Sequence, residues 1–290
     1  MEGEPRVAWD LAAELGEGPV WVERDSALWF VDIKKHEVHR FDPANGEKRS
    51  WKAPEQVGFV FPAEGGGFVA GLQSGLYHFD ETSGAFEQIV VVEPDKPGNR
   101  LNDGVVDPSG RLWFGTMDNG EKAKSGAFYC FEGGRLTRTA LDGIAITNGP
   151  AVSPDGRILY FVDTLRGTIG CADIADDGSL GSPRLFARID PRDGHPDGPT
   201  VDSEGCLWIA LYAGWAARRY SPGGELVETV RFPVANITKL ALGGTDLRTA
   251  FATTARQLLK PEDIARQPEI GDLFQFSVRV AGVPSPLARI

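Results

Sequence analysis

The most regular feature of this sequence is a pair of short apolar runs separated by a turn rich in Asp and Gly. In the stretch HPDGPTVDSEGCLWIALYAG (195–214), a polar turn leads into one apolar run, a DSEG turn follows, and CLWIAL forms the next run. The same order recurs in RLNDGVVDPSGRLWFGTM (100–117) and in TNGPAVSPDGRILYFVD (147–163). Short runs bounded by such turns predict paired β-strands. The chain therefore contains a repeated β-unit.

The repeat extends along the whole chain. An aromatic residue marks the second strand of each unit, and successive aromatic positions lie about 39 to 48 residues apart, which is the period of a four-stranded propeller blade. Two more alternating runs follow most of them, as HEVHRFD and EKRSWKA do in the first unit. The six marker residues are Trp29, Phe68, Trp113, Tyr160, Trp208 and Phe251.

We predict an all-β fold, a six-bladed β-propeller with four-stranded blades around a central channel, forming a single domain over residues 1–290. The alternatives are a β-sandwich or a β-helix, but a β-helix repeats at a shorter period and a sandwich does not repeat six times. Two segments stand apart. We expect residues 6–13 to supply the outer strand of the last blade and residues 260–267 to form one short helical turn.

Composition and charge limit the possible partners. The chain has 290 residues and a net charge of -11, which argues against nucleic acid because phosphate binding needs clustered Lys and Arg. No apolar run approaches the roughly 18 residues of a membrane span, and no signal peptide is apparent at the start. The three cysteines, Cys130, Cys171 and Cys206, have no CxxC spacing. We expect reduced thiols and a cytoplasmic protein that acts on a small molecule.

One polar residue recurs about eleven to thirteen positions before each aromatic marker, at the start of the innermost strand of each blade. Innermost strands line the channel, so we expect these side chains to converge at one mouth. Three of them are hard oxygen ligands, which predicts a site for one divalent cation such as Ca²⁺, Mg²⁺, Mn²⁺, Zn²⁺ or Fe²⁺. The three are Glu17, Asn148 and Asp197; the others are Gln56, Asn102 and Thr238.

Local turn scaffolding is the competing interpretation, because Asp, Asn and Gly are common turn residues. We interpret Asp107, Asp155 and Asp202 in that way. The histidines show no ligand or triad pattern: His36, His39 and His78 fall in outer strands and are expected at the surface or an edge, and a loop role is favoured for His195. The sequence has no GxSxG elbow, P-loop or strand-following GxGxxG.

At these residues the chain resembles the SMP-30/gluconolactonase/LRE family of regucalcin-like lactonases. The matching segments are LGEGPVW (15–21), LWFVDI (28–33), NRLNDGVVDPSGRLWFGTM (99–117), ITNGP (146–150), SPDG (153–156), PDG with VDSEGCLW (196–208) and ARQLLKPEDIARQPEIGDLF (255–274). The resemblance implies a six-bladed propeller with one divalent metal held by Glu17, Asn148 and Asp197. It also implies substrate binding by Arg100, Asn102 and Glu121, with Leu101 as the one departure from the usual RxND pattern.

These observations lead to a mechanistic hypothesis. The protein hydrolyses a sugar-derived lactone, the cation stabilises negative charge on the carbonyl oxygen, and Asp197 is the general base. Met117, Asp163 and Tyr212 are expected near the mouth. The alternative is a propeller without turnover that binds calcium or a sugar as a regulator. A paraoxonase-like propeller is disfavoured, because no candidates stand out for a second buried metal and a supporting histidine.

Overall fold

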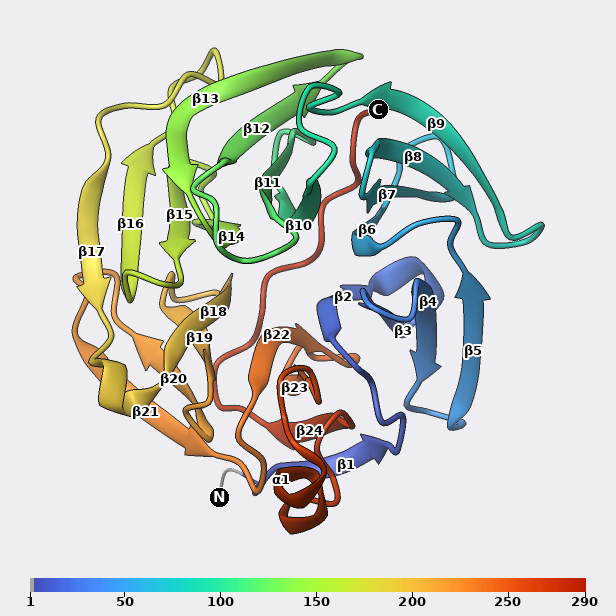
Figure 1. The fold of residues 1–290 in the computed structure, drawn as a ribbon, viewed down its shortest axis with the longest axis vertical. Helices are drawn as coiled ribbons and strands as arrows, with labels where there is room; N and C mark the ends of the chain where they lie inside the picture. The colour runs from blue at the N-terminus through green and yellow to red at the C-terminus, as the bar shows by residue number, and fades with distance from the viewer. Residues whose placement is uncertain (1–2) are drawn as a thin grey trace.

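The chain folds into a ring of six four-stranded antiparallel sheets around a central channel (Figure 1). The structure is a computed structural model that describes residues 3–290. Within each sheet the strands are hydrogen-bonded in chain order from the channel outward, except in the last sheet. The all-β propeller predicted from the repeat is confirmed.

The blades follow one another along the chain. Blade 1 contains β2 (Gly16–Val22), β3 (Ala27–Asp32), β4 (Glu37–Asp42) and β5 (Glu47–Lys52). Blade 2 contains β6 (Val57–Pro62), β7 (Phe68–Leu72), β8 (Gly75–Asp80) and β9 (Ala85–Val91). Blade 3 contains β10 (Asn99–Val106), β11 (Leu112–Asp118), β12 (Gly126–Glu132) and β13 (Arg135–Ile144).

The second half of the ring repeats this arrangement. Blade 4 contains β14 (Thr147–Val152), β15 (Ile158–Asp163), β16 (Thr168–Asp173) and β17 (Arg184–Arg188). Blade 5 contains β18 (His195–Val201), β19 (Leu207–Tyr212), β20 (Ala216–Tyr220) and β21 (Leu226–Arg231). Blade 6 contains β22 (Ile237–Gly243), β23 (Thr249–Thr254), β24 (Leu273–Ser277) and β1 (Arg6–Trp9). Short 3-10 turns lie at Glu23–Asp25 and Pro191–Asp193.

Both ends of the chain help to close the ring. Strand β1 pairs antiparallel with β24 and so supplies the outer strand of blade 6, as predicted. The predicted helical turn is α1 (Pro261–Arg266), between β23 and β24. Residues 278–290 then cross one end of the channel (Figure 1). Backbone hydrogen bonds hold this segment to blade 6 at Leu247, blade 2 at Pro62 and blade 3 at Gly110.

The aromatic markers are buried between the sheets, and three of them are anchored by an aspartate of a blade turn. The indole nitrogens of Trp29, Trp113 and Trp208 donate to aspartates at 3.0, 2.9 and 3.1 Å. In two of these pairs the acceptor is Asp107 or Asp202, which is fully buried and also accepts backbone N–H groups of its own turn. Their predicted role as turn scaffolding is confirmed.

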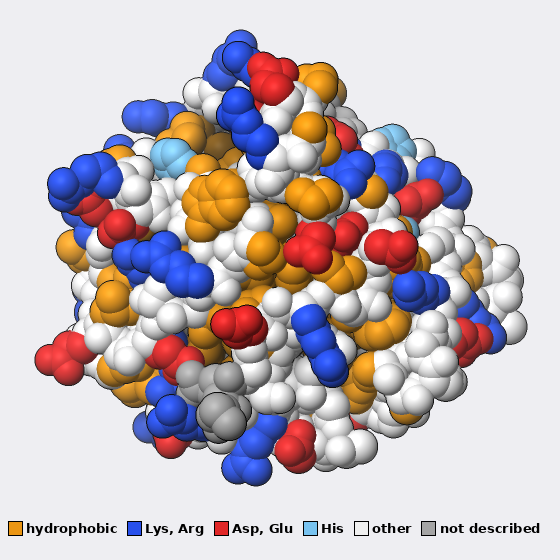
Figure 2. Space-filling view, turned by 90° about the horizontal axis from the view of Figure 1, so that it is seen from below, with side chains coloured by type: hydrophobic (Ala, Val, Ile, Leu, Met, Phe, Trp, Pro, Cys, Tyr) orange, Lys and Arg blue, Asp and Glu red, His pale blue; other side chains and the backbone are white. Residues whose placement is uncertain are grey.

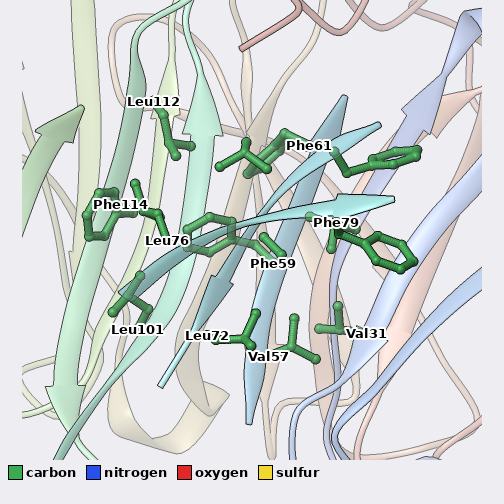
Figure 3. Packing of buried hydrophobic residues seen from close by; sticks show 14 of the residues in the cluster. Val31, Val57, Phe59, Phe61, Leu72, Leu76, Phe79, Leu101, Leu112 and Phe114 are labelled. Atoms are coloured by element: carbon green, nitrogen blue, oxygen red, sulfur yellow. The ribbon is translucent and has the colours of Figure 1, made fainter. Parts of the chain in front are cut away.

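Large apolar side chains from neighbouring blades fill the space between them, and Figure 3 shows this packing. Val31 of blade 1, Phe59 of blade 2 and Phe114 of blade 3 belong to one continuous cluster and are at most 1% exposed. Leu101 belongs to the same cluster and is 2% exposed. The Leu of the RLND motif therefore packs into the core between blades and not into the channel.

Every innermost strand carries a register shift at the same level of the channel. The shifts fall between Glu17 and Val20, between Leu101 and Gly104, and at the matching positions of the other four inner strands. A β-bulge interrupts the regular alternation of side chains and re-aims them locally. Consecutive residues such as Asn102 and Asp103 can therefore both be buried on the channel side.

The outer strands and the surface give one correction and three further findings. His39 was expected at the surface but is 1% exposed, because Trp9 of blade 6 packs against it with ring centroids 5.4 Å apart. The three cysteines are unpaired and buried. Within residues 3–290 no helix is long and apolar enough to cross a membrane. On the face seen in Figure 2, acidic and basic side chains are interspersed.

Candidate functional site

A cavity of about 290 Å³ opens at one mouth of the channel. Its polar lining includes every residue that the sequence assigned to a metal or substrate role. These residues are Glu17, Arg100, Asn102, Glu121, Asn148 and Asp197. They come from blades 1, 3, 4 and 5, so the ring brings together positions that are far apart in the sequence.

Glu17 and Asp197 form a pair of buried carboxyl groups at the base of this cavity. They are 4% and 6% exposed. Burial and the charge of Asp103 raise the pKa of Glu17 to about 8. Burial and the adjacent Glu17 also raise the pKa of Asp197 well above its usual range. Two carboxyl groups in this arrangement resist ionising together unless a cation compensates them.

Asn148 lies beside this pair, and hydrogen bonds fix the orientation of its amide. Its Nδ2 donates to Thr164 Oγ1 at 2.8 Å, and Thr164 in turn donates to the carbonyl of Pro196 at 2.9 Å. The Asn148 Oδ1 accepts from Asn102 Nδ2 at 2.9 Å and keeps a second lone pair. The amide oxygen is therefore the atom of Asn148 that can bind a cation.

Arg100 is the buried cation of the site, with 2% of its surface exposed. Its Nη1 donates to Asn102 Oδ1 at 2.6 Å and to the carbonyl of Leu101 at 3.2 Å, while its buried Nε has no protein partner. Burial lowers the pKa of Arg100 to about 10, and Glu121, Glu17 and Asp197 oppose this shift. The guanidinium stays charged at neutral pH and has a donor to spare.

Glu121 reaches the cavity from the loop after β11. Its carboxylate accepts from Gln257 Nε2 at 2.8 Å, and Gln257 belongs to the loop after β23 of the opposite blade. The backbone of Gln257 is held on both sides: its N–H donates to Glu14 and its carbonyl accepts from Tyr212 Oη at 2.6 Å. The contact between Glu121 and Gln257 thus spans the mouth.

Some residues predicted near the site lie elsewhere. Gln56 bonds to Lys34 and Gln73, outside the cavity lining, and the hydroxyl of Thr238 donates to the carbonyl of Gly16. Asp163 does not line the cavity, although Met117 and Tyr212 do. His195 is part of strand β18 and lines the cavity, where a loop role was favoured.

Sequence reasoning missed Thr164 and Gln257. Thr164 follows directly after strand β15, so its position at the mouth could have been predicted. A single Thr, however, does not indicate a function from the sequence alone. Gln257 lies in an irregular loop, and its position depends on contacts with blades 1 and 5. Neither contact follows from periodicity.

The donor set fits one hard divalent cation. It offers two carboxyl groups and one amide oxygen, which suit oxygen-preferring ions. Within residues 3–290 no group of three or more His, Cys, Asp or Glu side chains is placed to hold a metal. Asn148 would be the third ligand through its amide oxygen, and water or substrate oxygens would complete the coordination.

The chain is thus a six-bladed propeller whose cavity at one mouth is lined by buried oxygen donors. The profile of the SMP-30/Gluconolactonase/LRE-like region matches residues 15–256. The chain belongs to this family, as the motifs predicted.

Individual relatives support this assignment. The chain is 34% identical over 276 residues to the 6-deoxy-6-sulfogluconolactonase of Pseudomonas putida, with 94% of each protein covered. It is 36% identical over 285 residues to the L-arabinolactonase of Azospirillum brasilense, with 97% of this chain and 94% of the relative covered. The crystal structure of the calcium-binding protein regucalcin from Agrobacterium tumefaciens has a TM-score of 0.95 and 29% identity, covering 99% of this chain and 98% of that one.

Proposed function

We propose that this protein hydrolyses a sugar-derived lactone, an aldono-1,4- or 1,5-lactone, to the aldonic acid with the help of one divalent cation. The observation that carries the proposal is the placement of a buried arginine with a free donor beside a two-carboxyl, one-amide cluster in one cavity. A bare cation site has no need of Arg100. Two curated relatives that match over almost the whole chain are lactonases.

The size of the cavity suits a small, polar substrate. At about 290 Å³ it is near the lower end of the range for small-molecule sites. Arg100 and Asn102 both line the cavity, and we expect the Arg100 guanidinium and the second lone pair of Asn102 Oδ1 to bind substrate hydroxyl groups. Glu121 accepts from Gln257 and, as a carboxylate, has further acceptor sites for hydroxyl groups at the mouth.

Glu17, Asn148 and Asp197 would hold the cation. When bound, the cation would polarise the lactone carbonyl and favour the negative charge that develops on its oxygen. One carboxylate oxygen of Asp197 takes the proton from the attacking water, which frees the hydroxide to add to the carbonyl carbon. Collapse of the tetrahedral adduct breaks the ring C–O bond, and the protonated Asp197 returns the proton to the leaving oxygen. Thr164 holds the Asn148 amide in place, and Arg100 and Asn102 orient the ring so that the carbonyl faces the base.

The test is proton release from a panel of aldonolactones, using chelator-stripped protein with and without added Ca²⁺, Mg²⁺, Mn²⁺ or Zn²⁺. We expect cation-restored hydrolysis, and at least a roughly hundredfold loss of kcat in Asp197→Asn, as general-base catalysis commonly contributes that much. Asp163→Asn is the matched control, because Asp163 lies on β15 next to Thr164 but outside the cavity lining. Full activity in Asp197→Asn would exclude it as the base.

A second function, binding of calcium or a sugar without turnover, is favoured by one observation. The crystal structure with the TM-score of 0.95 is that of a calcium-binding protein, regucalcin. Hydrolysis no faster than the spontaneous rate, with every lactone and cation tested, would support this function instead.

A further inference from the structure

A lysine and an aspartate meet across the channel behind the candidate cation site. Lys239 lies on β22 of blade 6, and its Nζ is 2.6 Å from Asp103 Oδ1 on β10 of blade 3. These inner strands are opposite each other in the ring, because β22 lies between β2 and β18 whereas β10 lies between β6 and β14. The ammonium also donates to the carbonyl of Gly104 at 3.2 Å.

The pair is deeply buried between two cavities. Lys239 and Asp103 are 6% and 1% exposed. Lys239 and Gly104 line a second cavity of about 120 Å³, which residues 283–286 cover on the far side of the channel. An ion pair removed from water in this way is stabilising only when both partners are present, and loss of one partner leaves an uncompensated buried charge.

Both members of the pair contact the backbone directly after a candidate ligand. Asp103 Oδ2 accepts from the N–H of Gly149, which follows Asn148, at 3.0 Å. The methylenes of Lys239 pass over Gly198, which follows Asp197, so closely that a Cβ at Gly198 would lie 2.6 Å from them. The pair therefore forms the floor on which two of the three ligand positions rest.

The charges around this floor do not balance without the lysine. Glu17, Asp197 and Asp103 bring three carboxyl groups into the buried channel. Burial and the charge of Asp103 raise the pKa values of both ligands, Glu17 raises that of Asp197 further, and Lys239 lowers both. Arg100 is the other buried cation nearby, and its charge also lowers the pKa of Glu17, but without the lysine it would face the three carboxyl groups alone.

We propose that Lys239 is a built-in counter-cation of the cation site, a positioning residue that lets the propeller fold without its metal. The inference rests on the proposed function only in taking Glu17, Asn148 and Asp197 as the cation ligands. Lys239 compensates the Asp103 carboxylate through the buried ion pair, so that the bound ion has to compensate only the two ligand carboxylates. It also weakens cation binding, because a fixed positive charge lies behind the ligands.

Removing either partner should have opposite effects on cation affinity. Lys239→Met leaves Asp103 uncompensated, so we expect the Tm of the metal-free protein to fall by roughly 10 °C and the affinity for Ca²⁺ to rise by roughly tenfold. Asp103→Asn leaves the ammonium uncompensated and should lower the affinity. The double variant Asp103→Asn, Lys239→Met removes both charges, so it should recover most of the metal-free Tm.

The experiment measures Tm in chelator and Ca²⁺ affinity by calorimetry for the wild type, the two single variants and the double variant. Lys35→Met is the matched control, because Lys35 pairs with the buried Asp32 but is itself 40% exposed. An unchanged metal-free Tm in Lys239→Met, or a double variant no more stable than that single variant, would overturn the proposal. Equal loss of Ca²⁺ affinity in both single variants would also overturn it.

Failure of the proposed function gives a different result. If no divalent cation binds to the wild type or shifts its Tm, the metal-dependent mechanism is wrong. The metal-free Tm values of the four proteins still decide whether Lys239 compensates the channel carboxylates, because they require neither a cation nor a substrate.

Discussion

Glu17 should destabilise the metal-free protein at neutral pH, and replacing it by glutamine should reveal by how much. The folded pKa of Glu17 is raised from 4.5 to about 8. Below about pH 4.5 the carboxyl group is protonated in both the folded and the unfolded protein, so it does not change the free energy of unfolding. As the pH rises from 4.5 toward 8, the unfolded protein loses this proton while the folded protein keeps it, and the free energy of unfolding falls. At pH 7 the group lowers the free energy of unfolding by about 3 kcal/mol, since one pKa unit corresponds to about 1.4 kcal/mol.

Glu17→Gln removes this penalty while keeping an acceptor for the N–H of Gly18, which now donates to Glu17 Oε2 at 2.8 Å. We expect the Tm of the metal-free variant at pH 7 to exceed that of the wild type by roughly 6–10 °C. The difference should nearly vanish when a cation is present. Calcium at about 100 times its Kd adds about 2.7 kcal/mol to the wild type, whereas the variant has lost a ligand and should gain little.

The assay is differential scanning calorimetry at pH 5, 7 and 8.5, in chelator and in calcium. Glu93→Gln is a control of opposite sign: despite its burial, hydrogen bonds from Lys96, Asn99 and Tyr129 lower the pKa of Glu93, so its loss should destabilise the protein. The reasoning is refuted if metal-free Glu17→Gln is no more stable than the wild type at pH 8.5, or if the difference between them does not grow with pH.

Two further predictions concern single hydrogen-bond networks. Thr164→Val removes the acceptor of Asn148 Nδ2, so calcium affinity measured by calorimetry should fall about tenfold, in line with the effect of losing a partner that orients a ligand; an unchanged affinity would show that the ring holds Asn148 without it. Asp202→Ala leaves Arg219 Nε and the Trp208 indole without their acceptor, so urea unfolding should show a loss of about 3–5 kcal/mol, with kcat unchanged because Asp202 is remote from the cavity. A loss of kcat without a loss of stability would contradict this assignment.

The fold and most of the polar lining were predictable because both repeat once per blade. A constant distance from a buried aromatic residue to the start of the inner strand placed Glu17, Asn148 and Asp197 at the same level of the channel. His39 shows the limit of this reasoning. Its burial depends on Trp9, which belongs to the neighbouring blade, and a contact between blades leaves no mark on the periodicity of either strand.

The floor of the site was not predicted, for a different physical reason. Counting back from the aromatic markers selected Asn102 and Thr238, each of which is next to the residue that forms the buried ion pair, Asp103 or Lys239. Regular alternation would send adjacent residues to opposite faces of a strand. The bulges in β10 and β22 break that alternation at these positions, and a period-two pattern does not locate a bulge.

A signal for Asp103 was nevertheless present in the sequence. Glu17, Asn148 and Asp197 are each followed by a glycine, and so is Asp103. At Gly198 the reason is space, because an added Cβ would lie 2.6 Å from Lys239. At Gly149 a φ of +74° adds to the lack of space, since an added Cβ would lie 2.8 Å from Pro199. A polar residue followed by glycine at the bulge therefore marks a strand whose backbone approaches its neighbours in the channel. A search of the sequence for a polar residue followed by glycine would have placed Asp103 among the channel carboxylates. A cation such as Lys239 would then have been expected to compensate its charge.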